Sequence, residues 1–163
     1  MMKQRKVTAY IAIVLIVLTV GFIFMNSALP EEKSNSVSKT TAQAVEAVVT
    51  DDGAKDAEPI SVFLIKYIRK AAHAAEFFAL GLFICLFQLT ERHFDRAALV
   101  QIFSLLLATA TIDESIQILS ARGSNVRDIL LDLVGGAAAV CLFLILYFAV
   151  IRLQKAVQKK KEG

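Results

Sequence analysis

Residues 71–89 read AAHAAEFFALGLFICLFQL, an apolar run that only His73, Glu76 and Gln88 interrupt. At about 1.5 Å per residue, a helix of this length is long enough to cross the hydrocarbon core of a bilayer. Three further runs have the same character: residues 7–25, 97–119 and 129–151. The sequence therefore predicts an all-α integral membrane bundle of four transmembrane helices.

Composition supports a membrane protein and argues against a soluble domain and against nucleic-acid binding. Of the 163 residues, 56% are hydrophobic, and the mean hydropathy of +0.60 is too high for an ordinary soluble domain of this size. Four spans occupy most of the chain and leave no room for a separate soluble catalytic domain. The net charge of +3 comes from bases that flank the spans, where anionic lipid headgroups attract them. We therefore expect membrane lipids, and no nucleic acid, as partners.

Basic residues concentrate in three short segments: the N-terminus, the connection at 90–96 and the tail at 152–163. Short loops rich in Lys and Arg stay in the cytoplasm. Both termini are therefore predicted to be cytoplasmic, in a multi-pass protein of the cell membrane. The first span is predicted to be a retained anchor rather than a signal peptide, because its apolar core is too long and no small-residue cleavage site follows it.

The same segments divide the chain. Residues 1–25 are the N-terminal cytoplasmic segment and first span, and residues 26–59 are a flexible outer loop rich in Ser, Asn, Asp and Glu. Residues 60–151 are the core with spans two to four, and residues 152–163 are a basic cytoplasmic tail. Two readings of 60–68 stay open, because this segment suits either the membrane interface or an outward extension of span two.

Polar residues lie at one end of each of spans two, three and four. With the predicted threading this is the outer end in every case, and the short connection at 120–125 makes spans three and four antiparallel neighbours. Residues at i and i+3 or i+4 share a helix face. Three pairs have this spacing: His73 and Glu76, Asp113 and Gln117, and Asp128 and Asp132. Charges inside a membrane are costly and usually mark a functional site.

We therefore predict one outward-facing polar pocket that binds a ligand. Gly135 and Gly136 follow about one turn after its last acid, where they are expected to let a neighbouring helix approach closely. The predicted ligand-binding residues are Lys70, His73, Glu76, Asp113, Glu114, Gln117, Arg122, Asp128 and Asp132.

Four motifs in this region resemble a known family. They are RKAAHAAEFFALG at 69–81, DESIQ at 113–117, the arginine of SARGSN at 120–125, and RDILLDLVGG at 127–136. In this order they are similar to the VanZ family of small multi-pass membrane proteins. That family's pattern is Arg-Lys-x-x-His-x-x-Glu ending in Leu-Gly, then Asp-Glu-x-x-Gln, an Arg, and paired acids before a Gly. Ser27 also fits, whereas Ala74 stands where the family often has an aromatic residue.

The resemblance implies a cell-envelope protein with a VanZ-like core at 60–151. Named members are linked to resistance to teicoplanin-type glycopeptide antibiotics, but the family has no agreed biochemical activity. We therefore expect this protein to lower susceptibility to glycopeptides such as teicoplanin. It would do so by binding or modifying an envelope component, a cell-wall precursor or a lipid headgroup, at the polar pocket.

Besides ion or proton movement, which a narrow bundle with no acid near mid-membrane disfavours, three interpretations of the polar residues stay open. The first is a structural ion-pair network, since five acids face four bases and one His. The second is a recognition site in which Arg122 and Arg127 bind phosphate or carboxylate while the acids hold an amine. The third is an enzyme that acts on a lipid-linked substrate by acid–base chemistry or through a divalent metal. Its catalytic candidates are His73, Glu76, Asp113 and Glu114. No cofactor or metal ion is assigned, and the oligomeric state is not predicted.

Overall fold

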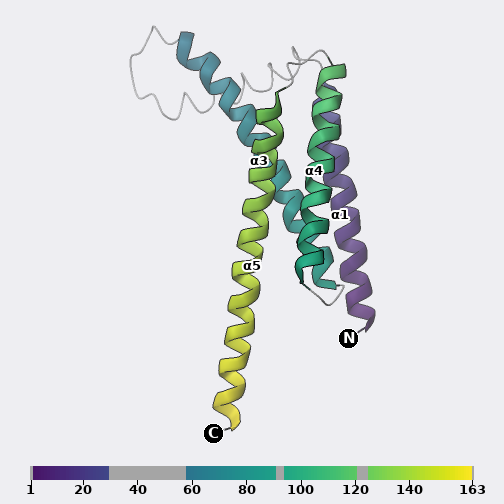
Figure 1. Ribbon diagram of the computed structural model, residues 1–163, viewed down its shortest axis with the longest axis vertical. Coiled ribbons are helices and arrows are strands. Elements are labelled where there is room, and N and C mark those ends of the chain that lie inside the picture. The colour runs from purple at the N-terminus through teal and green to yellow at the C-terminus, as the bar shows by residue number, and fades with distance from the viewer. Residues whose placement is uncertain (1, 30–57, 91–93, 121–124, 163) are drawn as a thin grey trace.

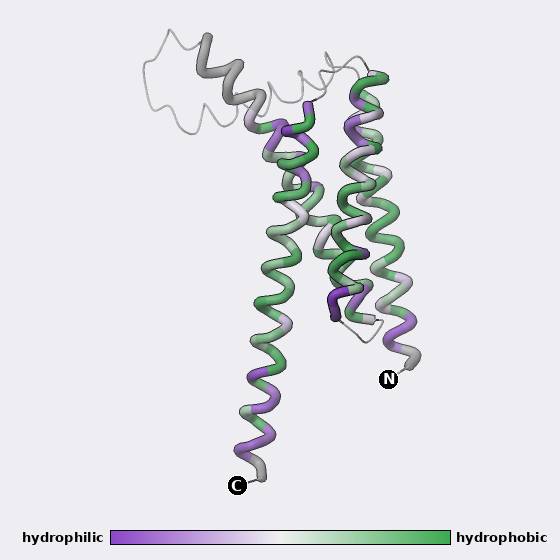
Figure 2. Tube along the Cα trace, in the orientation of Figure 1, coloured by the Kyte–Doolittle hydropathy of each residue, from purple (hydrophilic) through white to green (hydrophobic). Residues whose placement is uncertain are grey.

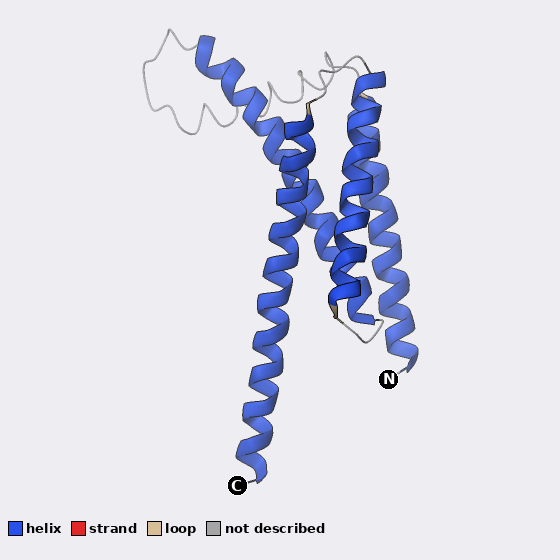
Figure 3. Cartoon of the chain, viewed as in Figure 1, coloured by secondary structure: helices blue, strands red, loops and turns tan. Residues whose placement is uncertain are grey.

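The computed structural model describes residues 2–29, 58–90, 94–120 and 125–162, which are helical apart from a few residues at the ends of these ranges (Figure 1). These described residues contain no strand (Figure 3). In chain order the helices are α1 (Met2–Ala28), α3 (Glu58–Thr90), α4 (Arg96–Leu119) and α5 (Val126–Glu162).

Each helix contains a stretch long and apolar enough to cross a membrane. These stretches are Gln4–Ala28, Tyr67–Thr90, Arg96–Leu119 and Val126–Lys160. The predicted all-α bundle with four spans is therefore confirmed. An even number of crossings returns the chain to its starting side, and the N and C ends point the same way in Figure 1. The cytoplasmic position of that side stays a prediction from the charges.

The helices satisfy their own polar groups, as a hydrocarbon environment requires. Thr19 donates its hydroxyl to the carbonyl of Leu15 at 2.8 Å, one turn earlier in α1. At the start of α4 the side chain of Asp95 caps the helix by accepting the N–H of Ala98 at 2.9 Å. Asp128 lies in the first turn of α5, where a negative charge is favoured by the helix dipole.

The outer surface of the bundle is as apolar as its core. Phe77 and Leu80 of α3 and Leu106 of α4 are fully buried. Yet Leu18 of α1 and Ile145 of α5 are 64% and 67% exposed. Helices that are hydrophobic all round belong in a membrane rather than in water. Figure 2 shows the same pattern as long hydrophobic stretches bounded by hydrophilic helix ends.

Glycines set the closest helix contact. A Cβ added to Gly135 would lie 2.2 Å from the carbonyl oxygen of Ala74, and one added to Gly81 would lie 2.9 Å from the carbonyl oxygen of Gly136. The expectation that Gly135 and Gly136 admit a neighbouring helix is therefore confirmed. The neighbour is α3, and α3 and α5 form the most extensive helix pair of the bundle. The short connection between α4 and α5 predicted the α4–α5 contact but not this larger one.

Two boundaries differ from the sequence prediction. The predicted outer loop at 26–59 is shorter at both ends, because α1 continues through Ala28 and α3 begins at Glu58. The backbone of α3 is one continuous helix, so residues 60–68 belong to the same helix as span two. Residues 30–57, which make up most of that loop, lie outside the described residues, as does the predicted ligand-binding residue Arg122.

Candidate functional site

Polar side chains from all four helices meet at one end of the bundle. We call this group the polar layer. Its members are Asn26, Ser27, Lys70, His73, Glu76, Asp113, Glu114, Gln117, Asp128 and Asp132. The predicted convergence of spans two, three and four is therefore confirmed in geometry. Whether these residues bind a ligand is a separate question.

Asp113 of α4 is the centre of the polar layer and is fully buried. Its Oδ2 accepts a hydrogen bond from Gln117 Nε2 at 2.9 Å, one turn further along α4. The same oxygen lies 3.9 Å from Nδ1 of His73 on α3. Gln117 Nε2 also lies 3.4 Å from Oγ of Ser27 on α1. One carboxylate and one amide thus connect three helices.

Glu76 joins α3 to α1 and also approaches the imidazole of His73. Asn26 Nδ2 donates to Glu76 Oε1 at 2.8 Å. The second oxygen, Oε2, lies 3.7 Å from His73 Nδ1. Nδ1 of the imidazole therefore faces two carboxylates, one from its own helix and one from α4. The spacing of i and i+3 explains the first contact, and only helix packing produces the second.

Asp132 brings α5 to the same point. Its side chain is almost entirely buried, with the residue 3% exposed. One ligand atom each from His73, Asp113 and Asp132 lies within 4.8 Å of the other two. The close crossing of α3 and α5 at Gly135, about one turn further along α5, explains this approach.

The rim of the polar layer is more open. Lys70 on α3 forms an ion pair with Asp128 on α5, and their side chains are 33% and 26% exposed. Glu114 Oε1 accepts the backbone N–H of Asn125, which joins the end of α4 to the start of α5. Arg127 is exposed and donates its backbone N–H to the Asn125 side chain at 3.0 Å.

The contacts among the described residues show only part of the expected balance between five acids and four bases. Among the described residues, Lys70 is the one Lys or Arg that pairs with an acid of the polar layer. Arg127 is exposed, and Arg122 lies outside the described ranges. The predicted guanidinium clamp is therefore not observed in the described part of the chain. The interior of the layer is dominated by carboxylates beside one imidazole.

Sequence reasoning missed one contribution to the site. Asn26 was expected in a flexible loop, and Ser27 was noted only for its fit to the family pattern. Both lie on α1, where Asn26 contacts Glu76 and Ser27 contacts Gln117. The threading itself could have found them, since span one must end on the same side of the membrane as the polar ends of the other spans.

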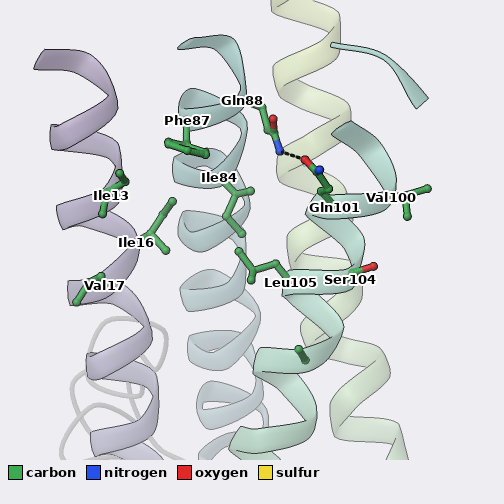
Figure 4. Close-up of a pocket in the computed structure, with 11 residues that line it drawn as sticks. Ile13, Ile16, Val17, Ile84, Phe87, Gln88, Val100, Gln101, Ser104 and Leu105 are labelled. Carbon is green, nitrogen blue, oxygen red and sulfur yellow. Dashed lines mark hydrogen bonds between the residues drawn. The ribbon is translucent and has the colours of Figure 1, made fainter. Parts of the chain in front are cut away.

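A separate cavity lies in the other half of the bundle (Figure 4). Its volume is about 500 Å³, and α1, α3 and α4 line it. Ile84 follows His73 by eleven residues and Leu105 precedes Asp113 by eight, which puts the cavity roughly 12–16 Å from the polar layer along the helices. Its lining is apolar apart from a few side chains, including Gln88 and Gln101, which share a 2.9 Å hydrogen bond. The cavity and the polar layer are distinct.

Comparison with known proteins identifies a family. The family described as VanZ/LLP1 matches residues 11–147, which include all four spans in part or whole and the entire polar layer. No curated protein and no solved structure matches the chain.

Proposed function

The chain belongs to the VanZ/LLP1 family, and from this premise we propose that it lowers susceptibility to glycopeptide antibiotics such as teicoplanin. It acts in the cell membrane, by binding an envelope component at the polar layer. The match supports a multi-pass membrane protein of VanZ type. The antibiotic role extends what the resemblance of the motifs implies.

One observation carries the proposal of a binding site. Three mutually close side chains, His73, Asp113 and Asp132, come from three helices and are largely or fully buried. Burying charge in hydrocarbon costs several kcal/mol per uncompensated group, by order of magnitude. A bundle held by apolar packing alone has no need of such a cost. Ionisable groups inside a membrane bundle mark functional sites for this reason.

The chemistry of the polar layer suits an amine- or cation-bearing group. Its interior presents carboxylates from α3, α4 and α5, while the exposed Arg127 stands at the rim beside the start of α5. A cell-wall precursor or a lipid headgroup can offer a cationic group to the carboxylates and an anionic group to an arginine. We propose this class of ligand.

A susceptibility measurement tests the function. A strain lacking the protein is complemented with wild-type protein, with Asp113→Asn, or with the control Gln101→Ala from the opposite end of the bundle. We expect wild-type and control to restore growth in teicoplanin and Asp113→Asn to leave the strain as sensitive as the deletion, at equal membrane abundance. Equal protection by Asp113→Asn, or no change on deletion, would contradict the proposal.

Cysteine labelling tests the outward position of the layer. In a variant with Cys85 and Cys141 replaced by Ala, Leu119→Cys marks the polar end, since Leu119 is 86% exposed at the end of α4. Lys159→Cys marks the C-terminal end of α5. A membrane-impermeant maleimide added to intact cells should label only Leu119→Cys. Labelling of Lys159→Cys alone would reverse the orientation and move the layer to the cytoplasmic side.

The position of His73 favours an enzyme as the second candidate. Its Nδ1 lies 3.7 Å from Glu76 Oε2 and 3.9 Å from Asp113 Oδ2, an arrangement suited to proton transfer. In this candidate the protein modifies a lipid-linked substrate. Mass spectrometry of lipid-linked precursors should show a species that depends on wild-type protein and is lost with His73→Gln. Identical lipid profiles in wild-type and deletion strains would reject it.

A further inference from the structure

We propose that the polar layer binds a divalent transition-metal cation of the zinc or manganese class through His73, Asp113 and Asp132. The inference deepens the proposed function by naming a ligand of the same site, and it rests on that function only in using the same layer. Its test measures metal rather than antibiotic susceptibility, so either proposal can fail while the other stands.

The donor set is the first reason. One imidazole nitrogen and two carboxylate oxygens, contributed by α3, α4 and α5, lie within 4.8 Å of one another. Three protein ligands of this kind with an open position are typical of reactive zinc sites, and mixed imidazole and carboxylate sets also suit manganese or iron. Ligands at about 2.0–2.2 Å from one tetrahedral ion lie roughly 3.3–3.6 Å apart. Side-chain rotations that close the set by about 1 Å would therefore complete it.

The state of Asp113 is the second and independent reason. This residue is 0% exposed, and its Oδ1 has no hydrogen-bond partner among the described residues. The other oxygen, Oδ2, is held by Gln117. A buried carboxylate oxygen without a partner is costly, and a cation beside it removes that cost. Gln117 then acts as the outer-shell group that orients a ligating carboxylate.

Charge balance is the third reason. Two ionised aspartates match the charge of one divalent cation. Among the described bases, Lys70 is already paired with Asp128 at the rim. Protonation of the aspartates would also neutralise them, and this alternative leaves the site without metal. The two cases differ in the number of metal ions bound per chain, which is one if the site binds metal and none if the aspartates are protonated instead.

Metal content of the purified protein is the direct test. Full-length protein in detergent, with its affinity tag removed, is equilibrated with Zn²⁺, desalted and analysed by mass spectrometry for metal, and the dissociation constant is measured by chelator competition. We expect one Zn²⁺ per chain. Asp113→Asn and Asp132→Asn should each weaken binding by at least as much as the loss of an outer-shell partner, which is about 10–100-fold. Zinc well below one per chain in the wild-type protein would overturn the proposal.

Asp128→Asn is the matched control. It makes the same acid-to-amide change on the same helix and in the same layer, but Asp128 is not one of the three close ligands. We expect it to weaken zinc binding much less than Asp132→Asn does, because it removes a nearby charge but no ligand. An equal loss in Asp128→Asn and Asp132→Asn would show diffuse attraction to acids and overturn the site.

A spectroscopic measurement on wild-type protein covers the case in which the variants fail to fold. Co²⁺ loaded in place of Zn²⁺ should give visible absorption bands of a low-coordinate ion, and X-ray absorption of the zinc form should show one imidazole with oxygen neighbours. Sulfur neighbours would point to Cys85 or Cys141 and overturn the assignment. So would the spectrum of a fully hydrated ion.

Discussion

The two halves of this bundle differ in how many polar side chains they place between the helices. In the half that holds the apolar cavity, Gln88 and Gln101 share a 2.9 Å hydrogen bond within a largely apolar lining. In the polar layer, side-chain contacts link α1 to α3, α1 to α4, α3 to α4 and α3 to α5. Apolar packing is sufficient to hold membrane helices together. The polar layer therefore carries costs that packing does not require, and such costs are expected where a protein binds or reacts.

The close crossing of α3 and α5 lies beside the polar layer, and disturbing it should have the largest effect. In Gly135→Ala the added Cβ would lie 2.2 Å from the backbone oxygen of Ala74, which cannot rotate away. We expect a loss of stability at or beyond the top of the about 1–3 kcal/mol range for overpacking. Thermal unfolding of the detergent-solubilised protein measures it.

Gly21→Ala is the control for this prediction. Nothing lies within 4 Å of the added Cβ at Gly21. Alanine has a higher helix propensity than glycine by about 1 kcal/mol, so this variant should be as stable as wild-type or more so. Equal melting of Gly135→Ala and wild-type protein would show that α3 and α5 do not cross this closely.

A pair of glutamine substitutions compares the two halves directly. Gln117→Leu removes the donor to Asp113 in the polar layer, and Gln88→Leu removes the donor to Gln101 at the cavity. Leaving a fully buried carboxylate without its donor costs about 1–3 kcal/mol. An interhelical hydrogen bond in a membrane protein averages only about 0.6 kcal/mol, and Gln101 is exposed.

Gln117→Leu should therefore unfold at a clearly lower temperature than Gln88→Leu. The measurement is the folded fraction that survives heating, assayed by size exclusion for both variants in the same detergent. Equal losses would remove the energetic distinction between the polar layer and the cavity.

The smallest effect is expected at the rim. Lys70 and Asp128 are about a third and a quarter exposed, and exposed ion pairs contribute about 0–1 kcal/mol. A double-mutant cycle with Lys70→Met and Asp128→Asn should give a coupling energy in this range that falls as salt is added. A coupling that is large and insensitive to salt would show that the rim is as dry as the interior.

Sequence reasoning found most of the site because two simple periodicities act together. The i, i+3 and i, i+4 pairs place acids on one face of each helix, and antiparallel threading places the three faces at one level. His73, Asp113 and Asp132 were predicted on these grounds and do meet. Asn26 was missed because span one was taken to end at residue 25, three residues before α1 ends.

The expected ion-pair balance stays a prediction, because Arg122 lies outside the described residues. Counting charges along the chain treats every base near a span as available to every acid. In the structure Lys70 faces Asp128, and Arg127 is exposed at the start of α5. A charge count has no information on direction, so it does not tell which acid each base faces.

The number of spans and the level of the polar groups along them were determined by the sequence alone, because hydropathy and helical rise are local properties that add along the chain. The partners of each polar group were decided only by the tertiary structure. The glycines of α5 let α3 approach until Ala74 touches Gly135, and that crossing brings His73, Asp113 and Asp132 to one point. Helix rotation and crossing angle depend on every contact at once, and for that reason no single stretch of sequence specifies them.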